Sequence, residues 1–269
     1  MTLQLDARQR AMLVEMGLPD FFPERGAQDD SPMAVVEAEA VEAIAVERTP
    51  PASVAPSIKG EVVAPPVSRR APSSVPAPDR GVESLEWAAL AEAVAVCRAC
   101  GLGSSRRNAV FGVGDLQPDV MVIGEPPDDN EDRSGEAFGG QVGQLLDNML
   151  RSIGVSRDNK AFIANVLKCR PPGGRRPMAE EFAQCEPLLR RQVQLLKPRV
   201  ILVMGRFAVE TVLQTDEPLG RLRGRVHAYE GVPVVVTYHP TYLLGNLADK
   251  SKAWADLCLA RELVRTPAP

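Results

Sequence analysis

At residues 120–123 the sequence reads Val-Met-Val-Ile, a short apolar run that is rich in β-branched residues. Three similar runs follow along the chain, at Phe162–Val166, Val200–Met204 and Val232–Thr237. Runs of this length and composition favour strands that are buried on both faces of a parallel sheet. Helical patterns lie between and after them, at Gln144–Ile153, Glu180–Leu196, Ala208–Leu213 and Lys250–Val264. This alternation predicts an α/β fold, a three-layer α/β/α sandwich around a short, mainly four-stranded parallel sheet.

The chain before these runs has a different composition. A helical pattern at Leu85–Val96 opens the predicted folded domain, which we assign to residues 85–269. Residues 28–84 are rich in Ala, Val and Pro, and eight prolines lie between Pro50 and Pro78, so we expect a disordered linker. Within residues 1–27, an amphipathic pattern over residues 6–18 predicts a short helix, which is either frayed or a docking segment for a protein partner.

Length and charge restrict the class of protein. The 269 residues contain no apolar run near the ~20 residues of a membrane span, and the N-terminus lacks the pattern of a secretion signal. We therefore expect a soluble, cytoplasmic and monomeric protein with no membrane contact. The net charge of −4 divides into −5 for residues 1–84 and +1 for the remainder. Any nucleic-acid surface is therefore expected in the C-terminal part.

Five cysteines in a chain expected to be cytoplasmic favour metal ligands or free thiols over disulfides. Cys97 and Cys100 form a C-x2-C pair, Cys169 follows the second predicted strand, and Cys185 lies on the next predicted helix. Four thiolates suit zinc and a [4Fe–4S] cluster alike, so the spacing leaves both open, together with a set of unrelated buried cysteines. Cys258 lies between two leucines and is interpreted as a small core residue.

Ligands of parallel α/β folds lie at the carboxyl ends of the strands. The segments there read GEPPDD at 124–129, NVLKCRPP at 165–172, MGRFA at 204–208 and TYHPTYLL at 237–244, and GEAFGGQVGQLL lies at 135–146. In this order, and with the four cysteines, these segments resemble the motifs of the iron–sulfur uracil-DNA glycosylases, family 4 of their superfamily. The resemblance runs from about Cys97 to Leu257.

The resemblance implies a DNA repair hydrolase of base excision repair. Such an enzyme flips uracil or another deaminated base out of DNA, hydrolyses the N-glycosidic bond and leaves an abasic site. The resemblance also implies a [4Fe–4S] cluster on Cys97, Cys100, Cys169 and Cys185 rather than zinc.

Residue roles follow from the matched motifs. Phe138 matches the residue that stacks on uracil, and Asn165 matches the amide that accepts from N3–H and donates to O4. His239 matches the donor to O2 of the departing uracil anion, and Glu125 matches the pocket wall beside the base and the attacking water. Taken singly, a structural role is favoured for each: Phe138 as a core residue, Asn165 as a turn cap and His239 as a turn residue. Together, in the order of the family motifs, they favour the function.

The predicted DNA surface has two parts. A basic loop suits phosphate contacts, with a solvated loop as the alternative, and it carries Lys168, Arg170, Arg175 and Arg176. A loop tip resembles the family's wedge into the space left by the flipped base, with core packing as the alternative, and it consists of Tyr242, Leu243 and Leu244.

The first motif differs from the family pattern at four positions, two of which are Ala137 and Gly139, in place of the proline and valine that flank the stacking phenylalanine. Pro126 stands where the family has alanine and provides no N–H for the base or the water. Asp128 stands where the family has glycine, and its carboxylate either orients the water or repels the uracil anion. Two hypotheses remain: a monofunctional uracil-DNA glycosylase, or a catalytically weakened glycosylase-like iron–sulfur protein that binds DNA or a repair partner. We favour the enzyme because Phe138, Asn165 and His239 are all present.

Overall fold

The computed structural model describes residues 81–266, and a six-stranded sheet lies at its centre. Four buried strands run parallel in the order β3-β2-β4-β6. Their bounds are β2 (Val120–Gly124), β3 (Ala161–Asn165), β4 (Val200–Met204) and β6 (Val232–Thr237). The four parallel strands predicted from the apolar runs are therefore confirmed to within one residue.

Two edge strands make the sheet mixed, which the sequence did not predict. β1 (Val113–Gly114) pairs antiparallel with β3, and β5 (Val226–Tyr229) pairs antiparallel with β6. β1 is two residues long, and β5 alternates between exposed and half-buried residues. Neither strand forms an apolar run, because an edge strand of this kind is not buried on both faces.

Nine α-helices surround the sheet in the described part of the chain. They are α2 (Trp87–Val96), α3 (Leu102–Ser105), α4 (Asp129–Ser134), α5 (Gly140–Ser152), α6 (Ala179–Leu196), α7 (Arg206–Leu213), α8 (Leu219–Leu222), α9 (Pro240–Gly245) and α10 (Lys250–Arg265). Three short 3₁₀ segments are η2 (Val82–Ser84), η3 (Pro172–Gly174) and η4 (Leu247–Asp249). The five helices predicted in the folded domain all form, whereas α3, α4, α8 and α9 are too short for a periodic signal.

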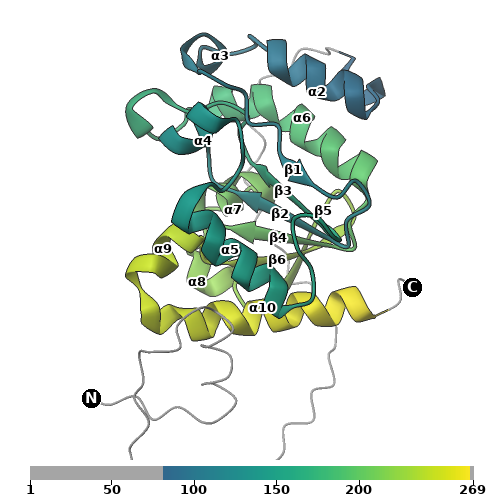
Figure 1. Ribbon diagram of the computed structural model, residues 1–269, viewed down its shortest axis with the longest axis vertical. Coiled ribbons are helices and arrows are strands. Elements are labelled where there is room, and N and C mark those ends of the chain that lie inside the picture. The colour runs from purple at the N-terminus through teal and green to yellow at the C-terminus, as the bar shows by residue number, and fades with distance from the viewer. Residues whose placement is uncertain (1–80, 267–269) are drawn as a thin grey trace, which may run out of the picture. The chain divides into compact units, whose positions relative to one another are not determined.

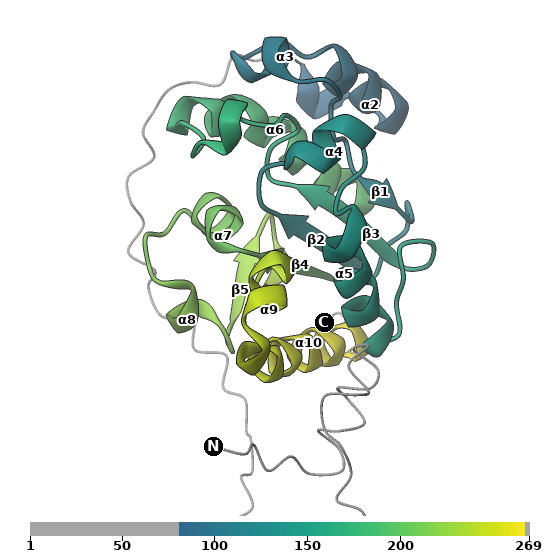
Figure 2. The ribbon, with the colours of Figure 1, turned by 60° about the vertical axis from the view of Figure 1, so that its left-hand side comes forward.

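Successive strand residues point into two separate cores. Met121 and Ile123 pack with α2, α6 and α7, whereas Val120 and Val122 pack with α5 and α10. Figures 1 and 2 show the resulting layers, with α10 along one side of the sheet and α6 with α2 on the other. The predicted three-layer α/β/α sandwich is confirmed.

The described chain begins at Gly81, slightly before the predicted domain boundary. Val82 is buried in the core, and η2 packs against α6, so residues 81–84 pack with the domain rather than ending the linker. The predicted helix over residues 6–18 and residues 28–80 of the predicted linker lie outside the described residues. Between residues 81 and 266, no helix combines the length and the apolar character that crossing a membrane requires.

Candidate functional site

Three segments that are far apart in sequence meet at one edge of the sheet. Gly124 ends β2 opposite Asn165, which ends β3, and β6 ends two residues before His239. Because the four central strands are parallel, their carboxyl ends share this edge. The fold therefore brings Glu125, Asn165 and His239 together.

Asn165 is buried with its amide group partly engaged. Its Nδ2 donates to the main-chain oxygen of Glu125 at 2.8 Å and to Oε1 of Glu131 at 3.1 Å. Both partners are acceptors, so the orientation of the amide is fixed by its surroundings. Oδ1 is buried without a protein partner. The sequence predicts that this amide offers both a donor and an acceptor, but its two donor hydrogens are already engaged and the acceptor remains.

Glu131 is a residue whose role the sequence reasoning missed. Its Oε1 also accepts from the main-chain N–H of Phe138 at 2.6 Å, and its Oε2 accepts from the N–H of Asp128 at 2.7 Å. Burial raises the pKa of this carboxyl, against the effect of these hydrogen bonds. One buried carboxylate thus connects Asn165, Phe138 and Asp128. The available signal was the Asp-x-x-Glu spacing of a capping box at 128–131.

Asp128 begins helix α4 as its N-cap. Its Oδ1 accepts from the N–H groups of Asn130 at 2.8 Å and Glu131 at 2.9 Å, which completes the capping box. The same carboxylate lies close enough to His239 to favour protonation of the imidazole. Pro126, which follows Glu125 in the sequence, is half-buried. A cap role for Asp128 was not anticipated from the sequence.

Phe138 has a strained backbone and a buried ring. Its φ of 55° lies in the left-handed region, and its carbonyl accepts from Nη2 of Arg157 at 2.7 Å. The ring lies against the backbone of Gly124, where an added Cβ would be 2.3 Å from Cζ of Phe138. Its centroid is 5.0 Å from that of His239, with the ring planes tilted by 32°. The absence of a side chain at Gly124 therefore leaves the space that this ring occupies.

His239 begins helix α9 and is held as a neutral donor. Its Nδ1 accepts from the main-chain N–H of Thr241 at 3.3 Å, which leaves the proton of the neutral ring on Nε2. Burial lowers the pKa of His239 to about 4, and the charge of Asp128 opposes this shift. At neutral pH the imidazole is therefore uncharged with an Nε2–H available.

The Glu125 side chain points away from Asn165 toward the first turn of α7. A Cβ added to Gly205 would lie 2.5 Å from its Oε1, and Gly205 has a φ of 96°. Burial raises the pKa of Glu125, and the main-chain N–H groups of Phe207 and Arg206 lower it. The helix N-terminus therefore partly compensates a buried carboxylate.

Lys168 is not on a DNA surface, and that prediction is wrong. The side chain is 1% exposed, and its Nζ donates to the main-chain oxygens of Asn165 at 3.1 Å and Phe111 at 3.3 Å. Burial lowers its pKa to about 8. The chain remains buried after the end of β3, so Lys168 lies in the interior. Main-chain carbonyls replace water around its ammonium group.

The three arginines of the same loop are accessible and paired. Arg170 forms an ion pair with Asp129 at 3.1 Å, and Arg175 with Glu181 at 2.6 Å. Arg176 pairs with Glu210. The loop therefore presents cations whose charge is partly balanced by neighbouring carboxylates.

The predicted wedge divides between surface and core. Tyr242 and Leu244 are each 42% exposed, whereas Leu243 is fully buried, so its predicted contact with DNA is wrong. Helix α9 turns successive side chains to different faces, and this one packs inward. Tyr242 also stacks on Tyr238 at 5.0 Å and donates from its hydroxyl to Asp249 at 2.7 Å.

Four cysteines lie in one region beside α2 and α6. Cys169 and Cys185 are buried, and Cys97 and Cys100 are half-buried against the same core. Cys185 accepts from the main-chain N–H of Lys168 at 3.4 Å, and burial raises its pKa to about 12. Burial raises the pKa of Cys169, the Arg106 guanidinium lowers it, and the neighbouring Cys100 and Cys97 raise it further. Within residues 81–266, no three Cys, His, Asp or Glu side chains gather tightly enough to hold one metal ion.

The remaining cysteine belongs to a different part of the domain. Cys258 is half-buried on α10, which packs on the opposite face of the sheet from α2 and α6. It is therefore less buried than the core position expected from its leucine neighbours.

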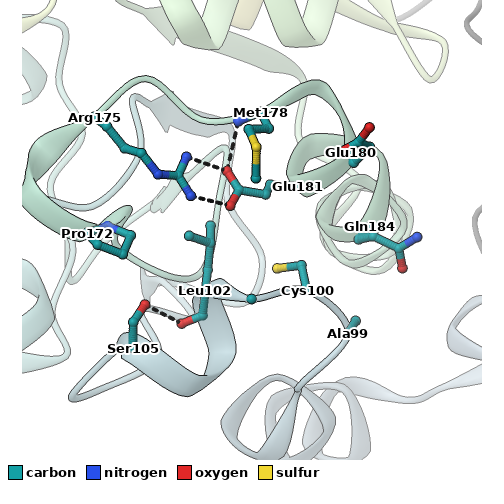
Figure 3. A pocket seen from close by; sticks show the side chains of 11 residues that line it. Ala99, Cys100, Leu102, Ser105, Pro172, Arg175, Met178, Glu180, Glu181 and Gln184 are labelled. Atoms are coloured by element: carbon teal, nitrogen blue, oxygen red, sulfur yellow. Dashed lines mark hydrogen bonds and ion pairs between the residues drawn. The ribbon is translucent and has the colours of Figure 1, made fainter.

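A cavity of about 450 Å³ opens between the C-x2-C turn and the start of α6. Figure 3 shows Cys100 and Leu102 on one side and Met178 on the other, with Arg175 and Glu181 joined by two hydrogen bonds of 2.9 and 2.6 Å. The cavity is separate from the Asn165 site and lies beside the cysteine region.

Comparison with known proteins adds sequence evidence. The profile of the Uracil DNA glycosylase superfamily matches residues 111–258. The type-4 uracil-DNA glycosylase of Archaeoglobus fulgidus is 39% identical over 156 residues, which cover 55% of this chain and 78% of that protein. The type-4 enzyme of Sulfurisphaera tokodaii is 36% identical over 195 residues, covering 69% and 87%. That of Pyrobaculum aerophilum is 37% identical over 180 residues, covering 63% and 90%.

Proposed function

The chain belongs to the uracil-DNA glycosylase superfamily, and on that basis we propose that it hydrolyses the N-glycosidic bond of uracil in DNA and leaves an abasic site. Relatives that are 36–39% identical carry the name type-4 uracil-DNA glycosylase. Within the chain itself, the observation that best supports this function is the unpartnered buried oxygen of Asn165.

The unpartnered Oδ1 of Asn165 favours a base that carries a hydrogen-bond donor at the position facing it. The N3 position of uracil carries a hydrogen, whereas N3 of cytosine has a lone pair that would face Oδ1 of Asn165. A buried acceptor left without a partner costs about 1–3 kcal/mol, so uracil satisfies the site and cytosine does not. Because both hydrogens of Nδ2 are engaged by Glu125 and Glu131, the amide cannot rotate to suit cytosine. The base reaches this depth only after it is flipped out of the DNA.

The departing base is stabilised by a neutral donor. We assign His239 Nε2–H to O2 of uracil, where negative charge grows as the glycosidic bond breaks. The lowered pKa keeps this imidazole neutral, so its proton stays on the protein and is offered as a hydrogen bond. Phe138, in contact with His239 through its ring, provides the apolar platform for the flat base.

Glu125 and Asp128 act as positioning residues in this scheme. Glu125 fixes Asn165 through its main-chain oxygen, and Asp128 caps the helix that carries Glu131. The main-chain oxygen of Glu125 and Oδ1 of Asp128 therefore already accept hydrogen bonds from groups of the protein. We therefore assign the altered first motif to holding the base-reading amide, and Pro126 to the wall of the pocket.

The test is excision from a uracil-containing oligonucleotide, followed by alkali to cleave abasic sites. Matched oligonucleotides with cytosine or thymine at the same position are the controls, in single-stranded and double-stranded form. We expect cleavage at uracil alone. Absence of cleavage, together with retained binding to DNA, would instead support the catalytically weakened alternative.

We further propose that Cys97, Cys100, Cys169 and Cys185 hold a [4Fe–4S] cluster. Each cluster thiolate binds a different iron, so its four sulfurs lie farther apart than the ligands of a single zinc ion. A neighbouring set of four thiols that form no disulfide, with N–H groups directed at two of the sulfurs, suits the cluster better than a single ion. When bound, the cluster supplies a covalent link between α2, the Cys169 loop and α6.

Iron, sulfide and visible absorbance test this cofactor. The Cys169→Ala variant should lose the brown colour and unfold roughly 10 °C earlier, or about 3 kcal/mol for a domain of this size. The matched control, Cys258→Ala, should keep both the colour and the melting temperature. A colourless wild-type protein with one zinc per chain would disprove the cluster.

We also propose that DNA binds across the loop arginines and the tip of α9. Arg170, Arg175 and Arg176 supply cations, and Tyr242 with Leu244 supplies an exposed apolar tip beside the site. Binding should weaken as salt rises, because phosphate contacts release counterions. A protein partner for residues 1–27 stays a prediction from the sequence.

A further inference from the structure

One guanidinium group connects two separate parts of the cysteine region. Arg106, which directly follows α3, donates from Nη1 to Sγ of Cys169 at 2.9 Å. Its Nη2 donates to the main-chain oxygens of Val94 at 3.1 Å and Ala95 at 2.6 Å. Arg106 and Cys169 are 63 residues apart in the sequence, so this contact is a product of the fold.

The two carbonyls belong to the end of helix α2. The last four carbonyls of a helix have no partner within it, and a cation near them is favourable. The last turn of α2 carries no basic residue of its own, so Arg106 supplies this charge from outside. The residue that follows α2 is Cys97, the first cysteine of the C-x2-C pair. Arg106 therefore holds the segment that leads into Cys97 against Cys169.

The contact with sulfur is of a different kind from that at Cys185. Cys185 accepts from a neutral main-chain N–H at 3.4 Å, whereas Cys169 accepts from a permanently charged group at a shorter distance. Hydrogen bonds with an ionised partner are about twice as strong as neutral ones. They favour the thiolate that a metal or cluster requires.

We propose that Arg106 is a positioning residue for the iron–sulfur cluster, one that raises the cluster's reduction potential and slows its loss. This inference rests on the proposed cofactor. Hydrogen bonds to cluster sulfurs are among the factors that set the potential, because they stabilise the more negative, reduced state. The same guanidinium fixes the two ligand-bearing segments relative to each other, so iron is released less readily.

The test compares three variants of the full chain with the wild type. Arg106→Ala removes all three donations, and Arg106→Lys keeps the charge without the forked geometry. Arg107→Ala is the matched control: Arg107 is exposed, and its main-chain N–H, which the substitution retains, donates to Asp132. The readouts are the reduction potential by voltammetry and the rate at which visible absorbance fades in excess chelator.

Arg106→Ala should shift the one-electron equilibrium about tenfold toward the oxidised cluster, which corresponds to about 59 mV. Its colour should fade several times faster than that of the wild type. Arg106→Lys should lie between the two, and Arg107→Ala should match the wild type. If Arg106→Ala retains no cluster, the reduction potential of Arg106→Lys tests the proposal instead: a potential below that of the wild type supports it, and an unchanged potential overturns it.

Unchanged potential and fading in Arg106→Ala would overturn the proposal. So would equal shifts in Arg106→Ala and Arg107→Ala, since each variant removes one positive charge and the shift would then reflect net charge rather than a hydrogen bond. A wild type without iron overturns this proposal and the cofactor, while the excision assay judges the enzymatic function separately. A wild type that contains the cluster but does not excise uracil overturns the enzymatic function. The proposed role of Arg106 is then still judged by the reduction potential and the rate of fading.

Discussion

The base-reading site and the cysteine region begin four residues apart, at Asn165 and Cys169, yet they satisfy buried polar groups in opposite ways. Around Asn165, donors and acceptors are matched within the protein, and Glu131 alone accepts from three N–H groups. One acceptor is left over. Around Cys169 and Cys185, burial raises the pKa of the thiols, and Arg106 and Lys168 compensate the charged form only in part.

The difference indicates what each region can bind. The base-reading site is preorganised and complete except for one neutral donor, which suits a flipped base. The cysteine region requires more positive charge than Arg106 and Lys168 supply before all its thiols can ionise, which suits iron. Lys168 joins the two regions, since its Nζ donates to Asn165 and its main-chain N–H donates to Cys185.

The largest expected effect separates the two regions. Asn165→Ala should lower the single-turnover rate of uracil excision by roughly a hundredfold or more, because a buried directional pair is lost. The visible absorbance of the cluster should stay at the wild-type level. If this variant loses its colour as well, the two regions are not independent and the comparison fails.

Glu131→Gln should affect the base-reading site through its framework. In the wild type, the carboxylate oxygens of Glu131 accept from three N–H groups. In the variant, the NH₂ group of the glutamine replaces one of these oxygens and faces an N–H donor. We expect about tenfold slower excision and a loss of about 2 kcal/mol in the free energy of unfolding, measured by urea denaturation. The exposed Glu136→Gln is the control and should behave as the wild type. Equal behaviour of the two variants would remove Glu131 from the site.

Lys168→Met tests the link between the regions. Met fills a similar space but leaves the main-chain oxygen of Asn165 without this donor, at a cost of about 1–3 kcal/mol. Excision should slow because Asn165 is held less firmly. The cluster should fade faster because the positive charge beside Cys185 is lost, although the main-chain N–H of residue 168 still donates to Cys185. The surface control Lys252→Met should change neither. An effect on one readout alone would show that Lys168 serves a single region.

Two substitutions at Asp128 distinguish its cap from its charge. Asn keeps an acceptor for the helix N-terminus, whereas Ala removes it at a cost of about 1 kcal/mol. We expect Asp128→Ala to be less stable and slower than Asp128→Asn. Asp128→Asn should excise uracil up to a few times faster than the wild type, because it removes a negative charge beside the departing anion. Slower excision by Asp128→Asn would instead assign the carboxylate to orienting water.

The smallest effect concerns pH. The pKa of His239 is lowered to about 4, so the imidazole stays neutral and the excision rate should be level from about pH 6 to pH 8. The contribution of this group to stability is present above its unfolded pKa of 6.5 and is lost as pH falls through about 4. Glu125 and Glu131 have raised pKa values and act in the opposite direction. A step in the pH–rate profile near pH 6.5 would contradict a neutral His239.

The sequence by itself determined the four parallel strands, because strands buried on both faces must be apolar without interruption. It also determined which motifs reach the sheet edge, since parallel strands end together. Edge strand β5 and the short helices escaped prediction, because their residues are partly exposed or too few to show a period. The capping box at 128–131 was readable, but its link to Asn165 was not.

The tertiary structure alone decided how side chains of similar chemistry are used. Lys168 and Arg170 are neighbours in one basic loop, yet one is buried against carbonyls and the other pairs with Asp129 near the surface. Leu243 and Leu244 are adjacent, yet one is in the core and the other is exposed. Burial and hydrogen bonding depend on groups that are distant in the sequence, such as Arg106 at Cys169, so local pattern could not assign them.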